Sequence, residues 1–219
     1  MIQAHPCPQI DTPVLPELRG LIDAAIHYSI CNPPHGVVSD GFGRCADYAI
    51  LGSRILNLLT GSNYRTVAGS EILDCGNGQL LLIAADRKSR RKAKHLSQLS
   101  MFHCWIEAHY CTEDEGPREE IIDFTVRHSH STARQFGIPY CPPSSALPYQ
   151  WAWRDELQLP AHLKIQGVDA SLKTADACST RLLHAFEAEN LRYFSQLESM
   201  AMNWLIKLID HLDLSNCEA

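Results

Sequence analysis

The chain has 219 residues, of which 45% are hydrophobic and 20% charged, and its formal net charge is -6 at pH 7. These values indicate a folded chain with a sizeable core and argue against a disordered protein or a general nucleic-acid-binding protein. No stretch approaches the roughly 18 uninterrupted apolar residues of a membrane-spanning helix. The N-terminus lacks the basic and then apolar order of a secretory signal. We therefore expect a cytoplasmic protein with no membrane and no nucleic acid among its partners. A single domain over 1–219 is expected, with its core at about 14–166 and a C-terminal helical part at about 170–214.

The nine cysteines are scattered singly along the chain, and no Cys-x-x-Cys pair occurs. Chains of this length in a reducing compartment normally keep such thiols free. We expect most of them, such as Cys104 and Cys178, to be small buried apolar groups. Only Cys45 has neighbours that suggest reactivity.

The first third of the chain predicts two helices. Apolar residues at helical spacing favour a helix over 16–30, with Pro16 in its first turn. A Pro- and Gly-containing break follows, and a loop rich in Gly leads to Gly43. Residues 45–59 are small or apolar on more than one side, which predicts a buried helix that ends at Gly61.

The middle of the chain predicts four strands, over residues 64–73, 79–85, 101–110 and 119–126. A tight hairpin turn is expected between the first two. Successive strand residues point to opposite faces, so correct pairing of the last two strands would place His103 and Asp123 on one face, opposite the mainly apolar one. A register slip of one residue would separate them.

The last third of the chain predicts an irregular segment and then helices. Residues 128–166 are Pro-rich and hold a cluster of aromatic side chains, which is typical of a wall or lid of a functional site. Residues 173–212 carry apolar stripes at helical spacing. These helices could cover the sheet or pair between subunits, so a homodimer is one assembly that the sequence allows.

Three residues have the properties of a catalytic cysteine site. Cys45 opens a helix, where exposed N–H groups and the helix dipole favour a thiolate. His103 would take and return the proton, and Asp123 would fix its tautomer. Gly43 would let the backbone approach a substrate closely, and the backbone N–H of Cys45 could serve as an oxyanion donor.

A family resemblance is carried by Gly43-Arg44-Cys45, His103-Cys104-Trp105 and Asp123-Phe124-Thr125, in that order. These segments resemble the transglutaminase-like branch of the papain-like cysteine protease superfamily, over about residues 37–126. The resemblance implies an α+β fold, with the nucleophile helix packed on an antiparallel sheet and extra C-terminal helices. It implies Cys45 as the nucleophile, His103 as the general base and Asp123 as the orienting carboxylate.

The resemblance also bears on the reaction. It implies attack on an acyl carbonyl through a thioester, with Trp105 packed beside the site. The chain shows no sign of the flanking β-domains of protein cross-linkers and lacks the Arg-Gly-Gly-x-Cys run of arylamine acetyltransferases. A small hydrolase or acyl transferase fits better, with a peptide or amide substrate bound against Tyr140, Trp151 or nearby aromatic side chains. No cofactor is predicted.

Two other interpretations stay open. One is a non-catalytic binding module on the same fold, with the aromatic segment or the basic segment 87–94 as its contact surface, although such a charge run is typical of a solvated loop. The other is a metal-binding protein built on His128 and His130. Zinc sites need four well-placed ligands, and no second closely spaced pair follows, so the prediction is that no metal is bound.

Overall fold

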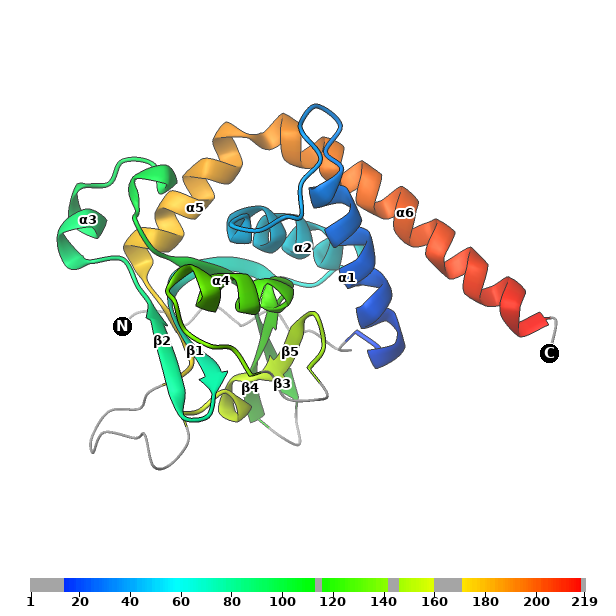
Figure 1. The fold of residues 1–219 in the computed structure, drawn as a ribbon. Helices are drawn as coiled ribbons and strands as arrows, with labels where there is room; N and C mark the ends of the chain where they lie inside the picture. The colour runs from blue at the N-terminus through cyan, green and yellow to red at the C-terminus, as the bar shows by residue number, and fades with distance from the viewer. Residues whose placement is uncertain (1–13, 113–115, 142–145, 160–170, 218–219) are drawn as a thin grey trace.

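The computed structural model describes residues 14–112, 116–141, 146–159 and 171–217. In these residues the fold is α+β, with one open antiparallel sheet of six strands and six α-helices (Figure 1). The helices are α1 Pro16–Cys31, α2 Cys45–Thr60, α3 Arg87–Lys92, α4 Ser129–Gln135, α5 Ala177–Glu189 and α6 Leu191–Cys217. The strands are β1 Arg65–Gly76, β2 Gln79–Ile83, β3 His103–Thr112, β4 Gly116–Asp123, β5 Gln150–Trp153 and β6 Lys173–Ala175.

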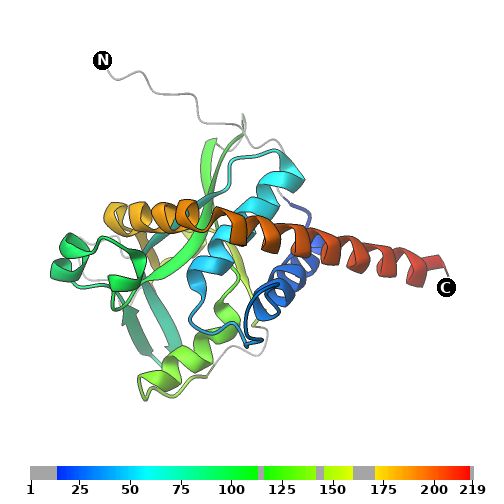
Figure 2. The same cartoon turned by 90° about the horizontal axis from the view of Figure 1, so that it is seen from above.

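The sheet has the strand order β2-β1-β3-β4-β5, and β6 also pairs with β1. One of its faces is packed against α2, which lies between the sheet and helices α1 and α6 (Figures 1 and 2). Cys104, Ile106 and Ala108 of β3 point into this main core. Trp105 and Ile121 point the other way, into a smaller cluster. The alternation predicted from the sequence is therefore present in the structure.

The helices and turns of the first half agree with their sequence signals. The two predicted helices correspond to α1 and α2, and α2 ends at Gly61, which adopts the left-handed conformation with φ 67°. The hairpin between β1 and β2 turns through Gly76, Asn77 and Gly78, all with positive φ. Because an added Cβ at Gly76 would lie 2.4 Å from the carbonyl oxygen of Cys141, only glycine fits there.

Three expectations for local structure are wrong. The connection 128–166 contains α4 and β5, and residues 173–175 form β6 instead of the start of a helix. These elements are three to seven residues long, too short to show a hydrophobic period, and pairing with neighbouring strands stabilises the two strands. Cys178 is exposed at the start of α5 and is not a buried apolar group.

The basic segment begins with a short helix, α3. Asp86 caps it, because its side chain accepts hydrogen bonds from the backbone N–H groups of Lys88 and Ser89. Arg90 forms an ion pair with Asp176 across a distance of 2.7 Å, which ties the segment to the start of α5. None of the helices in the described part of the chain is long and apolar enough to cross a lipid bilayer.

Candidate active site

Cys45 is the first residue of α2, directly after a loop with two left-handed glycines. Gly41 and Gly43 have φ values of 79° and 76°. A Cβ at Gly41 would lie 2.5 Å from the hydroxyl oxygen of Tyr48, so this turn excludes other residues. The Arg44 guanidinium fixes the loop further, since it donates to the carbonyl oxygen of Ile30 at 2.5 Å.

His103 and Asp123 meet on one face of the sheet, as their positions in the two strands predict. The register pairs Ile106 with Ile122, so odd-numbered residues of β3 and β4 share a face. The His103 Nε2 atom lies 2.7 Å from Asp123 Oδ2. The other carboxylate oxygen, Oδ1, accepts hydrogen bonds from the backbone N–H (2.8 Å) and hydroxyl (2.6 Å) of Thr125.

The environment of Cys45 favours its thiolate. A hydrogen bond with the Cys104 thiol makes the largest contribution, burial acts in the opposite direction, and a hydrogen bond with His103 and the charge of this imidazole add to the effect. Together they lower the pKa of Cys45 to about 5. Burial and the Cys45 thiolate raise the pKa of Cys104, so Cys104 keeps its proton and can donate it.

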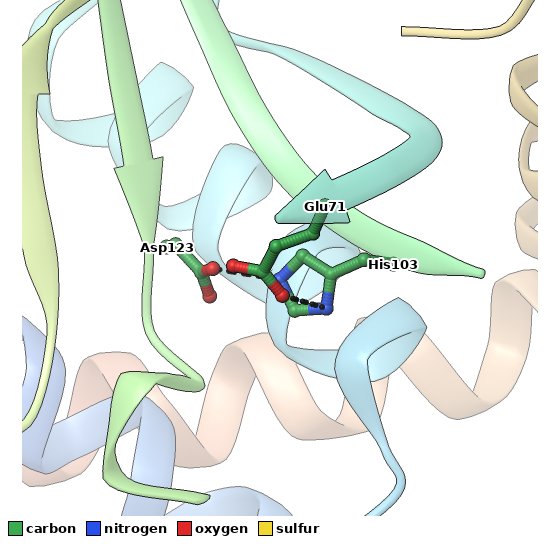
Figure 3. Close-up of side chains that lie close together, drawn as sticks. All are labelled: Glu71, His103 and Asp123. Atoms are coloured by element: carbon green, nitrogen blue, oxygen red, sulfur yellow. Dashed lines mark hydrogen bonds and ion pairs between the residues drawn. The ribbon is translucent and has the colours of Figure 1, made fainter. Parts of the chain in front are cut away.

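His103 lies between two carboxylates (Figure 3). Glu71 on β1 faces the second ring nitrogen, with 3.4 Å between Oε2 and Nδ1. Burial alone would lower the pKa of His103, but the charges of Glu71 and Asp123 outweigh it and raise the pKa to about 10. Because Nε2 is bonded to Asp123, Nδ1 is the nitrogen that could exchange a proton with another group in the cavity.

A buried lysine completes this cluster. The Lys173 ammonium lies 2.5 Å from Glu71 Oε1 and 2.6 Å from Asp123 Oδ2, and its side chain is 2% exposed. Its pKa is raised by the two carboxylates in spite of burial, so it is charged at neutral pH. The charges of Lys173 and His103 hold the pKa of Asp123 well below its ordinary value, although burial opposes this. The place where a cation could sit between these carboxylates is therefore taken by the protein's own ammonium group.

Cys45, His103, Asp123 and Glu71 all line one cavity of about 480 Å³. Its apolar wall is formed by Phe42, Leu73, Ile83, Met101, Phe102, Val126 and Phe136. Its polar wall is formed mainly by Ser100, His128, Ser129, Thr132 and Gln135. The volume and the mixture of apolar with a few polar groups are typical of a site for a small substrate group.

The predicted substrate-binding residues occupy different places. Gly43 lines the main cavity, where a Cβ would meet no atom within 4 Å. Tyr140 lines a second cavity of about 230 Å³, which shares Glu71 with the first. Trp105 does pack beside the site, 6.2 Å from the His103 ring between centroids, but it is fully buried and cannot touch a substrate.

Trp151 lies outside the lining of both cavities. Its indole N–H donates to Glu120 at 2.7 Å, and the Arg19 guanidinium lies 4.8 Å from its ring centroid. The side chain packs against the main core from β5. These contacts give Trp151 a structural role, and the described linings of the two cavities lend no support to the predicted contact with substrate.

The predicted alternative of a histidine metal site finds no counterpart in the described residues. His128 packs edge-on against Phe42 and Tyr48, and His130 packs against Tyr140. A second group of acidic and histidine side chains, Glu107, His109 and Glu119, lies farther along the same sheet. Arg154 forms ion pairs with both of its glutamates.

Sequence reasoning missed Glu71, Lys173 and the effect of the Cys104 thiol on Cys45, and it named Thr125 only as part of a motif, without its contact to Asp123. A signal for Glu71 was present, because a glutamate directly before Ile72 and Leu73 in a strand is a charge among apolar residues. No such signal was present for Lys173, because residues 173–175 show no strand pattern in the sequence. Comparisons of the chain with protein-family models, curated proteins and solved structures find no match. The chemistry of the cavity residues is therefore the basis for inferring a function.

Proposed function

We propose that the protein is a cysteine-dependent hydrolase or acyl transferase of papain-like, transglutaminase-like architecture, which acts on an amide or peptide bond through a thioester. One observation carries the proposal. A thiol at a helix N-terminus, whose environment lowers its pKa, lines the same cavity as a histidine that a buried carboxylate holds at 2.7 Å. This is the arrangement expected of an activated cysteine nucleophile.

The proposed reaction starts with the Cys45 thiolate and the protonated His103. The sulfur attacks the carbonyl carbon, a C–S bond forms, and the oxyanion accepts a hydrogen bond from the Cys45 backbone N–H, which has no partner inside α2. The C–N bond then breaks as the leaving amine takes the proton from His103 Nδ1. Water or another acceptor gives a proton back to Nδ1, attacks the thioester and releases the thiolate.

The cavity favours an uncharged, mainly apolar acyl group. Seven apolar side chains line it. The cationic side chains at or close to its described wall are already paired, Arg44 with Asp47 at 2.6 Å, and Lys173 and His103 with the two carboxylates. Burial and the charge of Arg127 lower the pKa of His128, so this ring is neutral at pH 7. An anionic acyl group would therefore meet Glu71 without a compensating cation.

Thiol alkylation tests the nucleophile directly. At pH 6, iodoacetamide should modify Cys45 much faster than the other eight cysteines, and Cys45→Ala should abolish the fast phase. The measurement is the rate at each thiol by mass spectrometry of peptides. If Cys45 reacts no faster than the rest, the nucleophile assignment is wrong, and a non-catalytic binding module on this fold is favoured.

A second measurement tests the thioester itself. The protein is mixed with a panel of N-acyl amides of different acyl groups, quenched in acid and analysed by intact-mass spectrometry. The mass of one acyl group should be added at Cys45, and hydroxylamine should remove it, as expected for a thioester. The Cys178→Ala variant is the matched control, because it removes an exposed thiol that does not line the cavity and retains the nucleophile.

A further inference from the structure

The buried Lys173 side chain makes contacts beyond the strand with which β6 pairs. In the register of β1 and β6 it is the cross-strand partner of Glu71, and a lysine that only joined these strands would be satisfied by that glutamate. Its ammonium also reaches Asp123 on β4 at 2.6 Å. A buried ammonium is costly unless it is paired, so two ionised carboxylates beside it are a stable arrangement.

The two carboxylate oxygens of Glu71 contact two different cations, the Lys173 ammonium and the His103 imidazolium. Oε1 accepts from Lys173 at 2.5 Å, and Oε2 faces Nδ1 of His103 at 3.4 Å. The imidazole therefore has a carboxylate at each nitrogen, Asp123 at Nε2 and Glu71 at Nδ1 (Figure 3). With His103 protonated, the two negative and two positive groups of this cluster balance.

We propose that Glu71 and Lys173 are positioning residues: Glu71 holds the His103 imidazolium in one orientation and keeps it protonated at alkaline pH, and Lys173 holds Glu71 and Asp123 in place beside it. This inference rests on the proposed function for its chemical meaning. Glu71 stabilises the proton on Nδ1, the atom from which the leaving amine takes it. Lys173 cancels the second negative charge, which would otherwise raise the free energy of the buried cluster and disfavour the thiolate.

The charged and titratable groups that face His103 come from five elements. They are Glu71 from β1, Asp123 from β4, Lys173 from β6, Cys45 from α2 and, next to it on β3, Cys104. Of these, Glu71 can be neutralised with the least disturbance. Glutamine has the same shape, and the Lys173–Asp123 pair and the Asp123–His103 bond both remain.

The test is the titration of His103 in the full chain, followed by NMR of the imidazole nitrogens. The His103→Gln spectrum assigns its signal among the 11 histidines. In the wild type, His103 should stay protonated to about pH 10, because the two carboxylates outweigh burial and set its pKa there. Glu71→Gln should lower this midpoint by about one to two pH units, the usual effect of an opposite charge within 4–6 Å. An unchanged midpoint overturns the proposal.

Glu119→Gln is the matched control, since Glu119 also lies 3.3 Å from a histidine nitrogen on the same strand pair, at His109, and does not line the cavity. It should leave the His103 midpoint unchanged. If Glu71→Gln fails to fold by circular dichroism, the wild-type titration carries the test, and a His103 midpoint near the ordinary histidine value of about 6.5 overturns the proposal. A purely structural ion pair would change the melting temperature in these variants but leave the midpoint in place, which would contradict the proposal.

The outcomes for this inference and for the proposed function are separable. A shifted His103 midpoint in a protein that never forms a thioester supports the positioning role and contradicts the enzymatic proposal. Thioester formation with an unshifted midpoint contradicts the positioning role alone.

Discussion

Two histidines on the same face of β3 have similar partners and different surroundings. His103 has Glu71, Asp123 and the Lys173 ammonium, and His109 has Glu119, Glu107 and the Arg154 guanidinium nearby. The side chain of His103 is 11% exposed and that of His109 is 33% exposed. Lys173 is 2% exposed, whereas Arg154 is 27% exposed.

The difference shows that burial and a nucleophile, rather than the residue types, distinguish a candidate active site. Solvent screens the partly exposed charges of Glu119 and Arg154 near His109, so their ion pair is expected to contribute little. The charges around His103 act on one another in a water-poor environment, and the cluster adjoins Cys45 and the main cavity. Parallel substitutions in the two clusters can test this interpretation.

The largest expected difference is in stability, between Lys173→Met and Arg154→Met. Lys173→Met leaves two buried carboxylates with only His103 as a cation, and removing one partner of a buried ion pair typically costs about 3–5 kcal/mol. Arg154→Met should cost about 1 kcal/mol, because Arg154 and Glu119 are partly exposed and the buried Glu107 keeps a hydrogen bond from the Trp105 indole. Urea unfolding at pH 7 measures both. Equal losses in the two variants would show that the clusters do not differ in the way proposed.

The next largest effect concerns thiol reactivity in His103→Gln and His109→Gln. Without the imidazolium, the pKa of Cys45 should rise from about 5 towards its ordinary value, since the hydrogen bond and charge of His103 are lost. The rate of alkylation by iodoacetamide at pH 6 should then fall about 10- to 100-fold. His109→Gln should leave the rate unchanged. A similar decrease in both variants would point to a general loss of structure.

The pH dependence of stability should also reveal His103. Its pKa is raised in the folded chain, so its contribution is fully present below about pH 6.5 and is lost as the pH rises towards 10. The lowered pKa of Cys45 makes the free energy of unfolding increase with pH between about pH 5 and 9, which opposes the effect of His103. The measurement should therefore be made in a Cys45→Ala background. There, the free energy of unfolding should decrease from pH 6.5 to 10 by at most about 1.4 kcal/mol per pH unit. Adding His103→Gln should flatten this decrease, and a slope that persists would assign it to another group.

The smallest effect is on charge selectivity. Iodoacetate and iodoacetamide differ by one negative charge, and Glu71 should disfavour the anionic reagent at Cys45. Glu71→Gln should raise the ratio of the iodoacetate rate to the iodoacetamide rate about three- to tenfold, as expected for a loss of roughly 1 kcal/mol of repulsion. Glu119→Gln should not change this ratio. A constant ratio in Glu71→Gln would mean that Glu71 does not face the incoming reagent.

The sequence predicted those parts of the site that depend on local pattern. The Gly-rich loop and apolar helix placed Cys45 at the start of α2, and strand alternation placed His103 and Asp123 on one face. It could not predict the contacts that need the packed fold. Lys173 belongs to a three-residue strand that forms only by pairing with β1. Trp151 was assigned to substrate because aromatic clusters often line sites, whereas β5 directs it towards Glu120 and Arg19.

The position of Lys173 in the chain has a consequence for biosynthesis. A ribosome makes Asp123 50 residues before the lysine that pairs with it. A nascent chain that has not yet released β6 has two carboxylates beside His103 and no ammonium between them, which disfavours their burial. We therefore expect the sheet to close around the Cys45 thiol only after the C-terminal part of the chain has been synthesised. The thiol would then acquire its activated state only after translation of Lys173.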